Sequence, residues 1–346
     1  MEFKGKNILV VRLSALGDVI RTTPTILGLK KAYPDSRITW LVEDSSAGLF
    51  PALEDIPLII LSRKKLKSRN PLVVLAEISR IVKLIRAQHF DLCLDFHGIL
   101  KSALIPYVAR IPIRIGFLPK GSKEHAHFFY THRVPLENHQ ISRYLRNLKL
   151  LEPYDPSIQL ESVSLSLSDE THQWIADMMK ENPLLLIPGT SMFGRNKQWP
   201  AESWAMLYKN LIERFPVKFV FGPADDHYRE SLSRLLNGDP PALPPLSIPE
   251  LGQALTHSRL VVVCDTGPMH LGSILRVPLL ALMGPSDPVL AQPLLDKNAH
   301  PRSSIFVPDV PCAPCRNRSC KELICQTFTK PKDVFDRIVL ACGDTG

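Results

Sequence analysis

The sequence lacks the features that mark several common classes of protein. No stretch approaches the roughly 20 consecutive apolar residues of a membrane-spanning helix, and a strand-like pattern begins too early for a signal peptide. The turn after the first apolar stretch has neither the G-x-G-x-x-G spacing of a dinucleotide site nor the lysine of a phosphate loop. The seven cysteines are an odd number, and three of them lie in apolar segments, which argues against a disulfide scaffold. These absences predict a cytoplasmic protein and disfavour a nicotinamide-dependent oxidoreductase.

Charge is distributed unevenly along the chain of 346 residues, whose net charge is +8. Residues 1–150 contain 24 Lys and Arg against 12 Asp and Glu, and the densest basic segment is R-K-K-L-K-S-R at 63–69. A positive surface attracts anions, although a solvated loop explains this segment equally well. No aromatic residues interleave with its charges as stacking platforms would, so nucleic acid is not a predicted partner.

Strand-like and helix-like segments alternate in both halves of the sequence, which predicts an α/β protein with mostly parallel sheets. The predicted strands lie at 7–12, 37–42, 58–61, 92–95 and 113–116 in the first half, and at 184–187, 218–221, 260–264 and 279–283 in the second. A polar, serine-rich stretch at 152–168 separates the two series. We therefore predict domains at 1–165 and 166–330, followed by a last helix within 331–346.

Polar residues follow three of the strands predicted in the second half. P-G-T-S follows the first, with Lys197 behind it, and hydroxyls with a cation suit a diphosphate. Asp225 follows the second strand and could hold sugar or ribose hydroxyls. Asp265 follows the third strand at a helix start, where free backbone N–H groups bind phosphate. Since the carboxyl ends of parallel strands share one edge, we expect a nucleotide diphosphate there, although each residue could instead be an ordinary helix cap or surface charge.

The first half carries an isolated acid in the turn after its first strand. L-S-A-L-G-D-V-I places Asp18 beside Gly17, just before a predicted helix. Ligands bind at this position in open α/β sheets, and an N-cap is the plain alternative.

The sequence resembles the bacterial heptosyltransferases of glycosyltransferase family nine over nearly its whole length. The motifs that carry the resemblance are L-S-A-L-G-D-V-I, D-F-H-G-I-L-K-S-A, I-P-G-T-S with K-Q-W-P, F-G-P-A-D and C-D-T-G-P-M-H-L. The resemblance implies the B-type glycosyltransferase fold, in which two Rossmann-like domains face each other across a cleft. It also implies that the C-terminal helix packs back on the first domain.

The same resemblance implies an inverting, metal-independent enzyme that moves heptose from ADP-heptose to a lipopolysaccharide core acceptor without a cofactor. Asp18 is implied as the base that takes the proton of the acceptor hydroxyl. The residues expected at the donor are Thr190, Ser191, Lys197, Asp225, Leu246, Asp265, Thr266, Gly267 and His270. Those expected at the acceptor are Ser14, Gly17, Lys101, Arg63 and Lys64, the last two chosen from their position in the basic segment. Because the acceptor has a lipid part, we expect peripheral contact with the anionic inner face of the inner membrane.

Four cysteines near the C-terminus form a separate motif. Cys312, Cys315, Cys320 and Cys325 have the spacing C-x2-C-x4-C-x4-C, which is close to that of zinc ligands but has a short central gap. A structural metal is one interpretation, and an iron–sulfur cluster is another. A set of reduced thiols in a compact loop is the plain alternative.

Two other functions remain open from the sequence. The same fold could use a different nucleotide sugar or glycolipid acceptor, which a panel of donors would reveal. A non-catalytic protein that binds a sugar nucleotide is the second alternative, but binding alone gives no reason for a base at Asp18.

Overall fold

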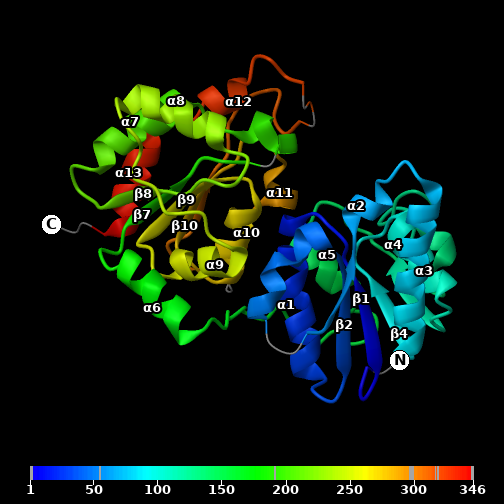
Figure 1. Cartoon of the computed structure of the whole chain (residues 1–346). Coiled ribbons are helices and arrows are strands. Elements are labelled where there is room, and N and C mark those ends of the chain that lie inside the picture. Colours follow the sequence, from blue (N-terminus) through cyan, green and yellow to red (C-terminus); the bar gives the residue numbers. More distant parts are fainter. Residues whose placement is uncertain are drawn as a thin grey trace. The chain divides into compact units, whose positions relative to one another are not determined.

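The computed structural model describes residues 3–53, 56–190, 192–295, 300–315, 317 and 319–343. The chain divides into two compact units, Met1–Val163 and Ser164–Gly346, so that the division falls two residues before the predicted boundary. Each unit contains one parallel sheet with helices on both faces, as Figure 1 shows. Within the described ranges, no helix combines the length and the apolar character that crossing a membrane requires.

The sheet of the first unit has the strand order β3-β2-β1-β4-β5-β6. Its strands are β1 (Asn7–Val11), β2 (Arg37–Glu43), β3 (Leu58–Leu61), β4 (Leu92–Asp95), β5 (Ile113–Phe117) and β6 (His132–Val134). Its helices are α1 (Leu16–Ala32), α2 (Arg63–Leu66), α3 (Pro71–Ala87), α4 (Leu100–Val108) and α5 (Arg143–Lys149), with short 3-10 helices η1 (Asp44–Ala52) and η2 (Ala126–Phe129). The edge strand β6 was not among the predicted strands.

The central strand β1 is a short apolar run whose last four residues are buried, as expected for a parallel strand covered on both faces. Its last residue, Val11, pairs with Leu41 of β2 and with Asp95 of β4. This register aligns the carboxyl ends of β1, β2 and β4. The residues that follow these strands therefore meet at one edge of the sheet.

The sheet of the second unit has the order β11-β10-β9-β7-β8. Its strands are β7 (Leu184–Ile187), β8 (Val217–Phe219), β9 (Leu260–Cys264), β10 (Leu279–Leu282) and β11 (Ser304–Phe306). Its helices are α6 (Asp169–Met178), α7 (Ala201–Leu211), α8 (Asp226–Leu236), α9 (Ile248–Thr256), α10 (Gly267–Ile274), α11 (Pro288–Ala291), α12 (Ile324–Thr327) and α13 (Pro331–Cys342), with the 3-10 helix η3 (Met192–Lys197). Because β7 lies between β8 and β9, the three strand ends predicted to carry polar residues are neighbours.

The last helix, α13, belongs to the second unit. Its residues Val334 and Ile338 are completely buried in the core of that unit, and the helix contacts α7 and β9. The core of the second unit thus holds the buried face of α13, and packing of this helix on the first domain stays a prediction. The apolar face of α13 packs against the sheet of the second unit, and the burial of these side chains stabilises that unit.

Candidate active site

Asp18 lies in the first turn of α1, directly after the carboxyl end of β1. Its carboxylate forms ion pairs with Arg12 and Arg21, whose side chains are only 11% and 14% exposed. Burial by itself would raise the pKa of Asp18, but the positive charges of the two arginines hold that pKa well below its ordinary value. Asp18 therefore stays ionised throughout the physiological pH range, and 29% of its side chain remains exposed.

The turn after β4 supports the turn that carries Asp18. Arg12 donates a hydrogen bond of 2.6 Å to the carbonyl oxygen of Phe96, and Leu13 donates its backbone N–H to Nδ1 of His97 at 3.3 Å. Burial and nearby positive charges, Arg12 first among them, lower the pKa of His97 to about 3. The ring is thus neutral at pH 7, and because Nδ1 accepts, the proton is assigned to Nε2.

His97 was missed as a site residue, although D-F-H-G-I-L-K contains both His97 and the predicted Lys101. Within the described part of the chain, no residue accepts a hydrogen bond from its Nε2. A signal was present in the sequence: a polar residue in the turn directly after a buried strand.

Asp95 has a structural task in the same turn. It is buried, and it accepts hydrogen bonds from the backbone N–H groups of His97 and Gly98 and from the hydroxyls of Ser102 and Tyr130 at 2.7–3.0 Å. With its oxygens occupied in this way, Asp95 shapes the turn and is not available as a base.

The predicted acceptor residues Arg63 and Lys101 meet at a buried carboxylate, Glu43, the last residue of β2. Lys101 donates to Glu43, and Nε of Arg63 lies 3.9 Å from the other carboxylate oxygen. The structure therefore brings these two cations together, whereas Lys64 is exposed to solvent. Glu43 was not predicted, because nothing in the sequence indicates that its side chain faces these two cations.

Ser14 and Gly17 flank the start of α1 on either side of its N-cap residue, and both are partly exposed beside Asp18. Arg146 of α5 adds positive charge to the same edge. Burial and the neighbouring charges of Arg12 and Arg143 lower the pKa of Arg146 to about 10, so it remains charged at pH 7. This edge of the sheet thus carries an excess of positive charge around the partly exposed carboxylate of Asp18.

Asp265 is the centre of the predicted donor site in the second unit. Its buried carboxylate accepts a hydrogen bond of 2.6 Å from Nζ of Lys197 and another from the hydroxyl of Ser286, and Nε2 of His270 lies 3.9 Å from its other oxygen. Burial opposes ionisation, but Lys197 and the other partners lower the pKa of Asp265. The predicted residues Lys197, Asp265 and His270 are therefore together. Ser286 follows β10 and was missed.

Asp225 follows β8, which β7 separates from β9, and one of its carboxylate oxygens lacks a partner among the described residues. Its Oδ2 accepts the backbone N–H of Gly222 at 2.7 Å, whereas no described residue forms a hydrogen bond with its buried Oδ1. Burial raises the pKa of Asp225. A Cβ atom on Gly189, in the P-G-T loop, would lie only 1.8 Å from Oδ2. Gly189 is thus required for the close approach of the carboxylate to this loop.

Four other predicted donor residues follow strands or precede helices of the same unit. Thr266 is the N-cap of α10 and Gly267 its first residue, and both are partly exposed, so the helix start is open to a ligand. Thr190 follows β7 and is partly exposed, as is Leu246 ahead of α9. Ser191 lies outside the described residues.

The four cysteines of the C-terminal motif line one pocket, together with Pro285 and residues 322–324. Burial and the other three thiols raise the pKa of Cys325, which reflects their proximity. Among the residues that the structure describes, however, no three potential ligands already form a metal site. The structural metal stays a prediction.

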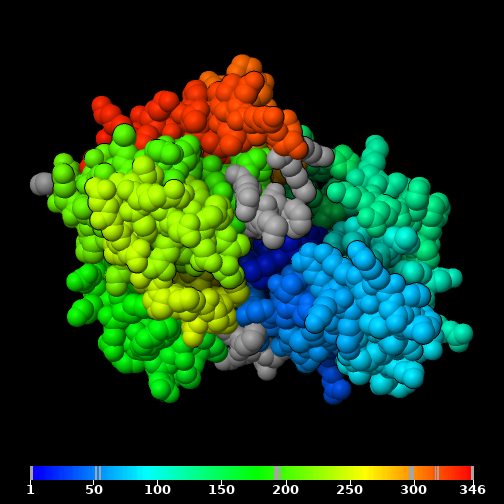
Figure 2. All heavy atoms as spheres, turned by 45° about the horizontal axis from the view of Figure 1, so that its top comes forward, coloured from blue at the N-terminus to red at the C-terminus, as the bar shows by residue number. Residues whose placement is uncertain are grey.

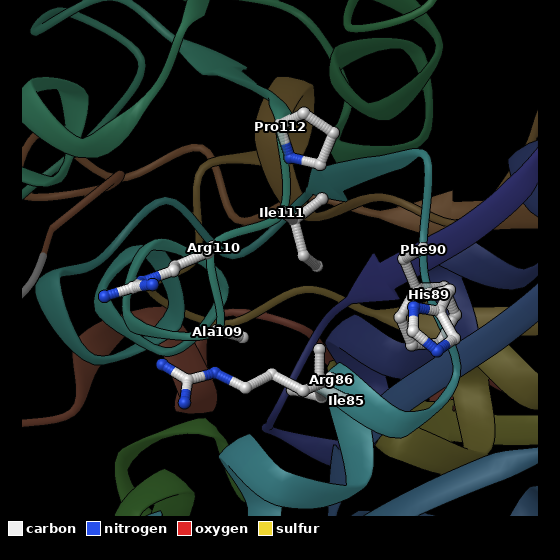
Figure 3. A pocket seen from close by; sticks show the side chains of 8 residues that line it. All are labelled: Ile85, Arg86, His89, Phe90, Ala109, Arg110, Ile111 and Pro112. Carbon is white, nitrogen blue, oxygen red and sulfur yellow. The ribbon is translucent and has the colours of Figure 1, made fainter.

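Another pocket lies at the opposite edge of the first sheet, before β4 and β5 (Figure 3). The last turn of α3 and the residues that follow α3 and α4 line it, and Arg86 donates a hydrogen bond of 2.8 Å to the carbonyl oxygen of Val108 at the end of α4. Helix C-termini carry partial negative charge and disfavour phosphate. This pocket is therefore a poorer site for a nucleotide or an acidic acceptor than the carboxyl edges.

Comparison with known proteins agrees with this arrangement. The chain is 29% identical over 325 residues to lipopolysaccharide heptosyltransferase 1 of Pseudomonas aeruginosa, covering 91% of this chain and 87% of that protein. Its structure is similar to a family 9 glycosyl transferase from Veillonella parvula, with a TM-score of 0.81, 21% identity and coverage of 99% and 98%. It is also similar to the E. coli heptosyltransferase WaaC with ADP, with a TM-score of 0.73, 21% identity and coverage of 97% and 99%.

The two structural likenesses confirm the predicted fold class, since each spans both units. The sequence profile of glycosyltransferase family 9 (heptosyltransferase) matches residues 78–325, well over half of the chain. That match includes D-F-H-G-I-L-K-S-A of the first unit and C-D-T-G-P-M-H-L of the second. The chain therefore belongs to glycosyltransferase family 9, the heptosyltransferases, and is a glycosyltransferase.

Proposed function

We propose that this enzyme transfers heptose from ADP-heptose to the inner core of lipopolysaccharide, inverts the anomeric centre, and uses Asp18 as its general base. Family membership and the names of its relatives support the sugar and the acceptor. The observation that carries the mechanism is an ionised, partly exposed carboxylate at the carboxyl edge of a positively charged unit.

Asp18 accepts the proton of the attacking hydroxyl. A lone pair of the acceptor oxygen forms the bond to the anomeric carbon, the bond from that carbon to the ADP oxygen breaks, and its electron pair leaves with ADP. A carboxylate with a depressed pKa is a weak base. It suffices here because an oxygen that is already bonding to the anomeric carbon is strongly acidic, so proton transfer is favourable late in the step.

The second unit would hold the donor. The open start of α10 presents backbone N–H groups to the diphosphate. Oδ1 of Asp225 is buried and has no partner among the described residues, so we propose that it accepts a hydrogen bond from a ribose or sugar hydroxyl. Lys197 is already paired with Asp265. Its charge is therefore partly neutralised, so the N–H groups carry much of the stabilisation of the leaving group.

The first unit would hold the acceptor. Carboxylates and phosphates of the inner core are suited to the cations at its carboxyl edge, where Glu43 orients Arg63 and Lys101. The lipid part of such an acceptor lies in a membrane, so we also propose that the basic unit makes peripheral contact with an anionic membrane surface.

The test measures ADP release by the purified full-length chain with ADP-heptose and a heptose-deficient lipopolysaccharide, against a panel of ADP- and UDP-sugars. We expect turnover with ADP-heptose alone, unchanged by a chelator added at assay, and a product whose anomeric configuration by NMR is opposite to that of the donor. Faster turnover with another nucleotide sugar would refute the donor assignment. Tight donor binding without turnover on any acceptor would identify a binding protein.

A further inference from the structure

The first turn of α3 exposes apolar side chains that the core does not use. Leu72 is 72% exposed, Leu75 63% and Val73 37%. The buried face of the same helix is formed further along by Ile81, Val82 and Ile85. Single exposed apolar residues are ordinary, but three within four positions form a local apolar patch.

A basic segment leads directly into this apolar turn. Residues 62–76 contain no Asp or Glu. Lys64, Lys67 and Arg69 are exposed, and within the described ranges none of them has an ion-pair partner. The next acid, Glu77, is buried and already pairs with Lys65 and Arg80, so it adds little negative charge to the surface. Cations and apolar side chains therefore lie side by side.

This segment lies at the same edge of the sheet as Asp18. The chain leaves the carboxyl end of β3 at Leu61 and enters α2, where Arg63 approaches Glu43 at the carboxyl end of β2. The helix α3 in turn contacts both α2 and α4. Figure 2 shows the light-blue residues of this region on the surface of the first unit. An acceptor approaching Asp18 with its lipid in a bilayer would meet this surface.

We infer that residues 67–75 form the surface with which the first unit lies on an anionic membrane, Lys67 and Arg69 at the headgroups and Leu72 and Leu75 at the acyl boundary. The apolar stretch is too short to cross a bilayer but suits the interfacial depth at which amphipathic segments bind. Anionic lipid matches both halves of the surface, since the cations need negative headgroups and the leucines need hydrocarbon. The inference deepens the proposed membrane contact, and its biological reason rests on the proposed function.

The experiment measures co-sedimentation of the full-length protein with vesicles of phosphatidylcholine alone or with phosphatidylglycerol. Two double variants probe the surface, Lys67→Ala with Arg69→Ala and Leu72→Ser with Leu75→Ser. Neutralising a cation should weaken binding to anionic vesicles about fivefold per residue, and the leucine pair should weaken it about tenfold or more.

Matched controls change equivalent residues of the second unit. Leu340 is 77% exposed, so Leu340→Ser controls for the loss of an exposed leucine. Exposed Lys180 and Lys332 control for the loss of two charges when both become Ala. These controls should bind vesicles as the wild type does. Equal binding of the wild type to neutral and anionic vesicles, or equal weakening by probes and controls, would overturn the inference.

Turnover with a lipid-free core oligosaccharide separates this inference from the proposed function. The two probe variants should keep wild-type turnover on that acceptor, because within the described residues no side chain of the four forms a hydrogen bond or an ion pair with the predicted site. Lys67 contacts Arg63 only through its backbone N–H, which alanine retains. A wild type that binds anionic vesicles as expected but releases no ADP would leave the surface intact and refute the proposed reaction. Loss of vesicle binding together with loss of turnover in the probe variants would overturn the inference, since a merely damaged fold explains both.

Discussion

Replacing Asp18 with Asn removes the proposed base but also the shared partner of two nearly buried arginines. The structure therefore predicts two separate effects. Loss of a general base should lower kcat by about 10²–10⁴-fold. Loss of the carboxylate leaves the guanidinium groups of Arg12 and Arg21, 11% and 14% exposed, without their ion pair.

The cost in stability follows from this geometry. Breaking a fully buried ion pair costs about 3–5 kcal/mol. Since 29% of the Asp18 side chain is exposed, solvent screening reduces that figure, and we expect a loss of about 1–3 kcal/mol in the free energy of unfolding. The pKa of Asp18 is depressed in the folded state, so its contribution is fully present above the unfolded value of about 3.9. That contribution is lost as the pH falls further, and the stability difference between variant and wild type should shrink below about pH 4.

Arg21→Met is the matched control, because it breaks the same cluster and leaves the carboxylate in place. It should lower stability by a similar amount but lower kcat by less than about tenfold, since the base remains. The assay measures ADP release well below the melting temperature, with urea unfolding and ADP affinity determined in parallel for wild type, Asp18→Asn and Arg21→Met. If Arg21→Met loses as much kcat as Asp18→Asn, Asp18 acts as a structural clamp, and the argument for a base fails.

Three further predictions follow from other contacts. His97→Asn keeps a hydrogen-bond acceptor for the N–H of Leu13 but loses the Nε2 donor, so this variant should fold normally and raise the KM for the sugar acceptor about tenfold. His97→Gln should instead lose stability and keep the wild-type KM. Identical effects of the two variants would contradict a role for Nε2. Gly189→Ala forces the carboxylate of Asp225 to move and should weaken the binding of ADP, measured by calorimetry. When it is combined with Asp225→Ala, the affinity for ADP should fall no further; additive losses of affinity would show that the two residues act separately. If the four cysteines between Cys312 and Cys325 hold a structural metal, protein purified without a chelator should contain close to one zinc or iron ion per chain. A metal content below about a tenth of an ion per chain, measured by mass spectrometry, would refute this hypothesis.

Much of the fold could be predicted because parallel strands buried on both faces appear as uninterrupted apolar runs. β3 and β4 have the predicted bounds, and β1 differs from its prediction by one residue. The short edge strands β6 and β11 were missed because neither forms such a run: β6 has two exposed residues and one buried residue, and the three residues of β11 are partly exposed. The packing of α13 in the core of the second unit was not predicted, because an apolar stripe shows that a helix packs but not on which surface.

The candidate site was predictable where chemistry follows directly from a strand end. Asp18, Asp225 and Asp265 each come within a few residues of a buried strand, and in a parallel sheet such residues share one edge whatever the strand order. The sequence by itself therefore determined the class of fold, the two edges that carry polar groups, and most of the residues on them.

Only the tertiary structure decided which of these groups are partners. Strand order places β4 beside β1 and β10 beside β9, so that His97 supports the turn of Asp18 and Ser286 donates to Asp265. Glu43 likewise meets Lys101, which lies 58 positions away in the chain. Such pairings depend on register, crossover and side-chain direction, and these arise when the whole sheet packs. Ionisation follows the pairings, because the pKa of a carboxylate depends on the charges that folding places beside it.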